Sequence, residues 1–201
     1  MMNSQEMWAV FEGCIEDYHQ EDKIDAPEKN PYPDNSFEAL LYAKNWIDTV
    51  QWHLEDEIRA PFIEPTEALI LKRRIDKSNQ NRTDLVEQID ERVVEQFTGV
   101  EAEENAPLNT ESPGWAIDRL SILALKIYHM QVEATRDDIA EDLLLKNQNK
   151  LAILKIQKDD LSLAIDQLLK ELAEGKRVVK VYRQMKMYND PQLNPVLYKK
   201  R

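Results

Sequence analysis

The sequence predicts an all-α protein: an up-down bundle of about five helices with a long final helix and an irregular basic C-terminal arm. The chain of 201 residues has only four glycines, and long uninterrupted segments separate its nine prolines. Within those segments, apolar residues recur every three or four positions. This length suits one hydrophobic core, so we expect a single domain over 1–201, with an N-terminal helix and linker at 1–35, the bundle at 36–175 and the arm at 176–201.

Each expected helix begins or ends at a recognisable signal. Serines that can cap a first turn stand at Ser4, Ser36 and Ser112, and a proline follows the last of these. Pro61 ends the second helix, and Gly99 suits the left-handed position after the third. The expected helices therefore run over about 4–21, 36–59, 66–99, from 113 onward, and 138–174.

The last expected helix carries a heptad pattern typical of coiled coils. Apolar residues alternate at spacings of three and four from Ala140 to Leu172, interrupted by Asn147 and Lys158. About 37 helical residues span about 55 Å, which is longer than a compact bundle. We therefore expect either a homodimer through the Ala140–Leu172 seam or the 176–201 arm, or intramolecular packing of the same residues.

Charge and cysteine content exclude several classes of protein. The net charge of −12 argues against nucleic-acid binding, and no apolar run approaches the roughly 18 residues of a membrane span. The arm carries +7 and the rest of the chain −19, so we expect an irregular arm, with some strand, that docks on the body or on a partner subunit. The single Cys14 cannot form an internal disulfide, and 1–12 lack a signal peptide, which favours a cytoplasmic protein.

Two expected helices place polar residues where a plain bundle would have Leu or Ile. In the second helix, His53 lies beside the apolar stripe and Asp56 follows it by one turn. In the third, Asn79 and Arg82 fall inside the apolar series. Because stranding a buried arginine costs several kcal/mol, Arg82 either faces water or meets an anionic group.

The helix that begins at Pro113 adds a third polar group. Arg119, Lys126 and His129 recur at spacings of seven and three, which places them nearly on one line of that helix. Three helices would thus contribute to one polar cleft, formed by His53, Asp56, Asn79, Arg82, Arg119, Lys126 and His129.

The first functional hypothesis is binding of a small anionic ligand that bears phosphate or carboxylate groups. Arg82, Arg119 and Lys126 would hold the anion, with Asn79 beside them. His53 or His129 would serve as acid or base near neutral pH, and Asp56 would orient His53.

The alternative for the same residues is a structural ion-pair network. In it, Arg82 pairs with Asp56, and Arg119 pairs with an acid of the second or third helix. Both interpretations stay open from sequence alone.

A second hypothesis is a metal-dependent hydrolase of the helical-bundle type. Bundle metal sites usually combine Glu with Glu-x-x-His pairs, whereas here His53 precedes Asp56 and Lys126 precedes His129. The chain resembles the damage-inducible bundle enzymes that hold metal with three histidines only in its count of three, His19 included. We therefore assign no metal ligand, leave the cofactor unknown, and keep His53, Asp56 and His129 as catalytic candidates.

A third hypothesis is a non-catalytic oligomerising interaction module. The heptad seam and the arm, which is basic and rich in Tyr and Met, would join protomers or bind an acidic partner.

Several long motifs are similar to an uncharacterised bacterial family, catalogued as domain of unknown function four-two-five-four. These motifs are Trp52–Asp56, Ile75–Asp84, Ser112–Met130 and Tyr182–Pro191. The resemblance covers most of the chain beyond Asn35. It implies an all-α fold and a bacterial cytoplasmic setting, and it carries no activity that could be transferred to these residues.

Overall fold

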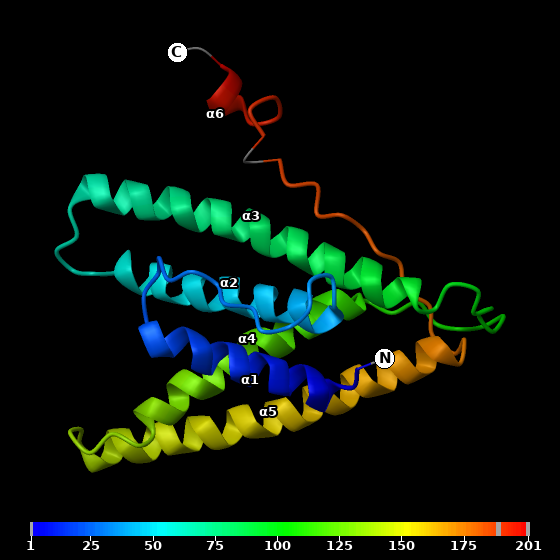
Figure 1. Cartoon of the computed structure of the whole chain (residues 1–201), viewed down its shortest axis with the longest axis horizontal. Helices are drawn as coiled ribbons and strands as arrows, with labels where there is room; N and C mark the ends of the chain where they lie inside the picture. The colour runs from blue at the N-terminus through cyan, green and yellow to red at the C-terminus, as the bar shows by residue number, and fades with distance from the viewer. Residues whose placement is uncertain (1, 188–189, 200–201) are drawn as a thin grey trace.

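The structure is helical in the regions where the sequence predicts helices. The computed structural model describes residues 2–187 and 190–199 (Figure 1). Its helices are α1 (Ser4–Glu21), α2 (Phe37–Glu57), α3 (Pro65–Glu95), α4 (Pro113–Glu133), α5 (Glu141–Ala173) and a short α6 (Pro195–Tyr198). The all-α fold with a long last bundle helix is confirmed. None of the helices within the described residues has both the length and the apolar character needed to cross a membrane.

Helix α4 occupies the centre of the bundle. It packs against α1, α2, α3 and α5, while α2 lies between α1 and α3. Figure 1 shows α3 along one edge of the molecule and α5 along the opposite edge. The core forms mainly where α1, α2 and α4 meet, and its largest fully buried apolar side chains are Met7, Phe11, Ile15, Tyr18, Leu41, Tyr42, Leu54, Ile89, Ile117, Leu120 and Leu125.

Capping interactions correct one predicted helix start and confirm another. The N-cap of α1 is Asn3 rather than Ser4, because Asn3 and Glu6 exchange side-chain and backbone hydrogen bonds in a complete capping box. Ser4 instead donates its backbone N–H and its hydroxyl to Asp166 of α5, each at 2.7 Å. Ser36 caps α2 as expected, accepting a backbone N–H three residues on at 3.0 Å.

The start of α4 depends on a carboxylate from α3. Ser112 holds the N-cap position, but its hydroxyl donates to the buried Asp90 at 2.5 Å instead of capping the helix. The other oxygen of Asp90 accepts the backbone N–H of Gly114 at 2.6 Å. An aspartate at this place complements the positive end of the helix dipole, so Asp90 ties the two helices together.

The heptad seam of α5 faces the interior of the same chain. Asn147, Ile165 and Leu172 are buried, and Lys158 places its ammonium 4.0 Å from the centre of the Trp8 ring. Packing against α4 and α1 of the same chain therefore buries or half-buries most of the predicted Ala140–Leu172 seam.

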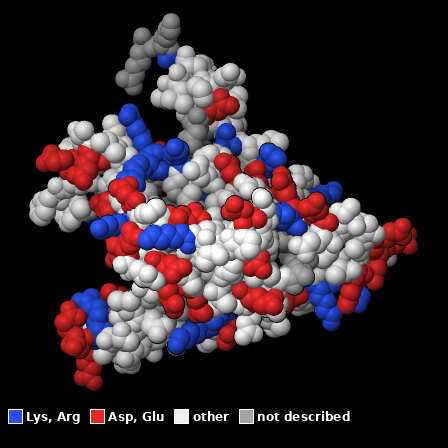
Figure 2. Space-filling view, viewed as in Figure 1, with Lys and Arg blue, Asp and Glu red and all other residues white. Residues whose placement is uncertain are grey.

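The basic arm runs back along α3 (Figure 1). Lys186 donates to the backbone oxygen of Asn79 at 2.9 Å, and Arg183 pairs with Glu91 at 3.0 Å. Within the described part of the arm, the expected strand amounts to an isolated bridge between Leu108 and Val178. Acidic side chains, with Lys and Arg among them, are spread over the face in Figure 2, in keeping with the net charge of −12.

The close approach of α3 to Gly114 gives a first prediction. A Cβ at this position would lie 2.6 Å from Cγ of Asp90 and 2.7 Å from the carbonyl oxygen of Val86. Gly114→Ala should therefore lower the free energy of unfolding by about 1–3 kcal/mol in urea denaturation. The matched control is Gly13→Ala in α1, where a Cβ meets nothing within 4 Å and where helix propensity favours alanine by about 1 kcal/mol. Equal effects of the two substitutions would contradict the packing argument.

Candidate functional site

All three histidines of the chain meet at one place. His19 comes from the last turns of α1, His53 from α2 and His129 from α4. Each offers a ring nitrogen, and the three nitrogens all lie within 4.8 Å of one another. The Nε2 atoms of His19 and His53 are 3.3 Å apart. Side chains that are 34 and 76 residues apart in the sequence thus form one compact cluster, here called the histidine cluster.

An aromatic residue directly precedes each histidine in the sequence and packs on the histidine of another helix. Tyr18 of α1 stacks on His53 of α2, with ring centres 5.1 Å apart. Trp52 of α2 stacks on His129 of α4, with ring centres 4.6 Å apart and planes inclined by 5°. The third contact closes the cycle, since Tyr128 of α4 lies 4.3 Å from His19 of α1. The aromatic rings therefore fix the orientations of all three imidazoles.

The ring nitrogens of the histidine cluster differ in their hydrogen bonding. Nδ1 of His19 lies 2.7 Å from the backbone oxygen of Ile15 and donates its hydrogen to that oxygen. Nε2 of His129 is buried and has no hydrogen-bond partner among the described residues. A buried polar atom without a partner is costly, which points to a ligand as its natural partner.

Burial disfavours the charged form of His53 and His129. It lowers the pKa of His129 from 6.5 to about 4, and the neighbouring His19 and His53 contribute to this shift. The pKa of His53 is also lowered by burial, although the charge of Asp22 opposes this shift. Neutral imidazole is the form that binds a metal ion.

Two carboxylates lie at the solvent side of the histidine cluster. An oxygen of Asp22 is 3.7 Å from Nε2 of His53, and the side chain of Asp22 is 58% exposed. Asp22 ends α1 with a left-handed φ of 49°, one turn after His19. Asp56 is exposed on α2, and its negative charge partly opposes the lowering of the pKa of His129 and of His53. The cluster is therefore open to water on a side that carries negative charge.

Arg82 belongs to a buried network instead of a ligand cleft. Its Nε donates to Asp48 at 2.7 Å and its Nη2 donates to Asp118 at 2.8 Å, and the fully buried ammonium of Lys44 contacts both carboxylates. Ser121 adds a hydrogen bond to Asp48 at 2.7 Å. In the structural alternative predicted from the sequence, Arg82 pairs with Asp56. Its partners in the structure are Asp48 and Asp118 instead. We call Lys44, Asp48, Arg82 and Asp118 the charge network.

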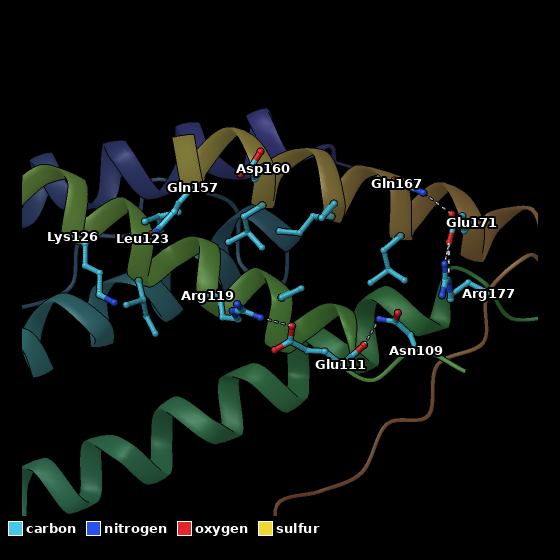
Figure 3. Close-up of a pocket in the computed structure, with 16 residues that line it drawn as sticks. Asn109, Glu111, Arg119, Leu123, Lys126, Gln157, Asp160, Gln167, Glu171 and Arg177 are labelled. Carbon is cyan, nitrogen blue, oxygen red and sulfur yellow. Dashed lines mark hydrogen bonds and ion pairs between the residues drawn. The ribbon is translucent and has the colours of Figure 1, made fainter. Parts of the chain in front are cut away.

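The remaining predicted residues lie elsewhere. The side-chain oxygen of Asn79 accepts a hydrogen bond from Gln51 at 2.8 Å. Arg119 donates to Glu111 of the preceding loop at 2.9 Å, not to an acid of α2 or α3. Arg119 and Lys126 line a groove between α4 and α5 (Figure 3), and the volume of this groove is about 830 Å³. The seven predicted residues thus fall into separate groups, and only His53 and His129, with Asp56 beside them, share the histidine cluster.

Residues 38–181 match the family described as "Protein of unknown function (DUF4254)". The match covers His53, His129 and the whole charge network, and it begins after His19. No curated protein and no solved structure matches the chain. Any function must therefore be argued from the geometry of the site.

The charge network predicts unequal effects for two arginines. Arg82→Met should destabilise the protein by about 3 kcal/mol or more, because it leaves two buried carboxylates with Lys44 as their only cation. Arg119→Met, which removes an exposed pair with Glu111, should change stability by less than about 1 kcal/mol. Urea denaturation of both variants measures the difference. A stabilised Arg82→Met protein would contradict the assignment.

The lowered pKa of His129 predicts a pH-dependent stability of the metal-free protein. The unfolded state takes up a proton near pH 6.5, whereas the folded state resists protonation until about pH 4. The unfolded state therefore binds more protons in this window, so stability should fall as the pH decreases from about 6.5. Urea denaturation with a chelator, between about pH 7.5 and 5, measures this slope, and His129→Gln should reduce it. An unchanged slope in that variant would contradict the prediction.

Proposed function

We propose that this chain, which belongs to the family described as protein of unknown function (DUF4254), binds a divalent transition-metal ion through His19, His53 and His129 and uses it to activate water for hydrolysis. The observation that carries the proposal is the convergence of three ring nitrogens, from three helices, within 4.8 Å of one another.

The spacing of the nitrogens supports a metal of ordinary coordination geometry. With Zn–N bonds of about 2.0–2.1 Å in a tetrahedral site, two ligating nitrogens lie about 3.3–3.4 Å apart. The Nε2 atoms of His19 and His53 are 3.3 Å apart. The buried, unpartnered Nε2 of His129 would be the third ligand, because the ring nitrogens that the three histidines offer all lie within 4.8 Å of one another.

The choice of donors favours zinc, iron, cobalt, nickel or copper over magnesium or calcium. Imidazole nitrogen suits the former, whereas the latter prefer oxygen ligands. The hydrogen bond from Nδ1 of His19 to the backbone oxygen of Ile15 would orient that ring and increase its basicity.

Three protein ligands, with water at the side of Asp22, are typical of a catalytic rather than a structural site. A metal bound there would lower the pKa of a coordinated water to about 7. Asp22 is placed to accept the proton of that water, because its carboxylate is 3.7 Å from Nε2 of His53 and is 58% exposed. This arrangement supports the hypothesis of a metal-dependent hydrolase of the helical-bundle type.

A second proposal keeps the small anionic ligand but places it in the groove between α4 and α5. Lys126 lines this groove beside Arg119 and is exposed there, while the guanidinium of Arg82 is engaged in the charge network (Figure 3). The nearby Asp160 and Glu171 reduce the positive charge of the groove. We therefore rank this proposal second. The single domain over 1–201 and the bacterial, cytoplasmic setting stay predictions from the sequence.

The metal proposal is tested by elemental analysis of protein purified through a tag that contains no histidine. We expect about one transition-metal ion per chain, or a cobalt-loaded form with visible absorption typical of nitrogen ligands. His53→Ala and His129→Ala should each lower metal affinity at least about tenfold. The control is Cys14→Ser, which alters another soft donor of the chain but should retain the metal, because Cys14 is buried and burial raises the pKa of its thiol.

The hydrolytic step has a separate test. Asp22→Asn should retain the metal content but lower the hydrolysis of an activated ester such as p-nitrophenyl acetate about 100-fold, with a change in the pH–rate profile. A metal-free native protein that takes up no added ion would end the metal proposal. A loaded protein whose Asp22→Asn variant is fully active would leave the metal site intact and remove the role of Asp22.

A further inference from the structure

The outer face of α5 carries a second heptad seam, opposite the one that packs inside. Its positions are spaced by four, three, four, three and four residues, and all are exposed: Leu145, Asn149, Ala152, Ile156, Asp159 and Leu163. The three largest apolar side chains are 58% (Leu145), 61% (Ile156) and 70% (Leu163) exposed. Ile156 and the buried Ile165 are nine residues apart, which is about 180° around the helix.

No described helix of the same chain covers this face. In Figure 1, α5 forms one edge of the molecule and its packing partners lie on its other side. Those partners are α4 and α1. The basic arm does not cover this face either, because it contacts α3, where Lys186 donates to Asn79 and Thr83. Three large apolar side chains therefore remain exposed along one face of the helix, and such a face favours contact with another molecule.

We propose that the outer seam is a homodimer interface in which α5 of a second copy packs antiparallel, about a two-fold axis near residue 154. Such an axis places Leu145 opposite the partner's Leu163, and Ala152 opposite the partner's Ile156. The two polar positions also meet, because Asn149 lies opposite the partner's Asp159 and can donate its amide hydrogen to that carboxylate. A seam that complements itself under a two-fold rotation is what an isologous dimer requires.

The charges of α5 favour the same orientation. Over residues 143–158 α5 has four lysines and no acid, and over residues 159–173 it has four acids and one lysine. An antiparallel partner sets each basic half against an acidic half. A parallel partner would place Asp159 against Asp159 and the lysine-rich halves against each other, which is unfavourable.

The contact would extend over about 27 Å of helix, from Leu145 to Leu163. It uses none of the three histidines, so this inference and the proposed metal site can fail independently. It also differs from the dimer expected through the Ala140–Leu172 seam, whose residues lie on the inner face of α5.

The first experiment measures molar mass by light scattering at micromolar concentration. The native chain should have twice the mass of 23.6 kDa, and Ile156→Glu combined with Leu163→Glu should reduce it to 23.6 kDa without loss of helical circular dichroism. The matched control is Ile70→Glu on α3, where the isoleucine is 56% exposed but lies off the seam, and it should remain a dimer. A monomeric native chain, or a double variant that is still a dimer, would overturn the proposal.

The second experiment fixes the orientation and needs no destabilising charge. A mixture of Leu145→Cys and Leu163→Cys chains should form a disulfide-linked dimer on mild oxidation, whereas Leu145→Cys alone should not. The native Cys14 gives little background, because it is buried and its thiol pKa is raised by burial. Efficient linkage of Leu145→Cys to itself would show a parallel pair and overturn the antiparallel arrangement.

Discussion

The charge network holds α2, α3 and α4 in one register, and the rest of the bundle depends on that register. Arg82 of α3 reaches a carboxylate on each of the other two helices, and Lys44 bridges the same two carboxylates. Two cations and two anions balance inside the protein, where an unpaired charge would cost several kcal/mol. A slide of one turn along any of these helices would break several of the ion pairs together. The same register places His53 on α2 beside His129 on α4.

Local chemistry made most of the helix boundaries predictable, and long-range contacts account for part of the errors. Ser36 caps α2 as its sequence indicates, since a cap needs only residues within one turn. Ser4 does not cap α1, because Asn3 forms the capping box with Glu6 and Ser4 instead donates to Asp166 of α5, 162 residues away. Ser112 likewise gives its hydroxyl to the distant Asp90 of α3. The local pattern contains no information about either distant carboxylate.

The site was less predictable than the fold. Spacing along one helix cannot show which helices are neighbours, so the line of Arg119, Lys126 and His129 suggested one cleft where the structure has separate groups. Arg119 pairs with Glu111 of a loop. Because lysine is rarely buried, the sequence did not indicate that Lys44 is a cation of the core. One signal was present: each of the three histidines directly follows a tyrosine or tryptophan. Those pairs would have indicated that His19 belongs to the candidate site.

The cyclic packing of aromatic rings on imidazoles would link the N-terminal helix to an ion bound in the histidine cluster. His19 is the contribution of α1, and undocking that helix would leave two of the three imidazoles and expose Tyr18. By mass action, an ion that prefers three ligands to two stabilises the docked helix by the ratio of its two affinities. The concentration of the ion would then set how often α1 is docked. Removal of the ion would undock α1 before it affects the segment from α2 to α4.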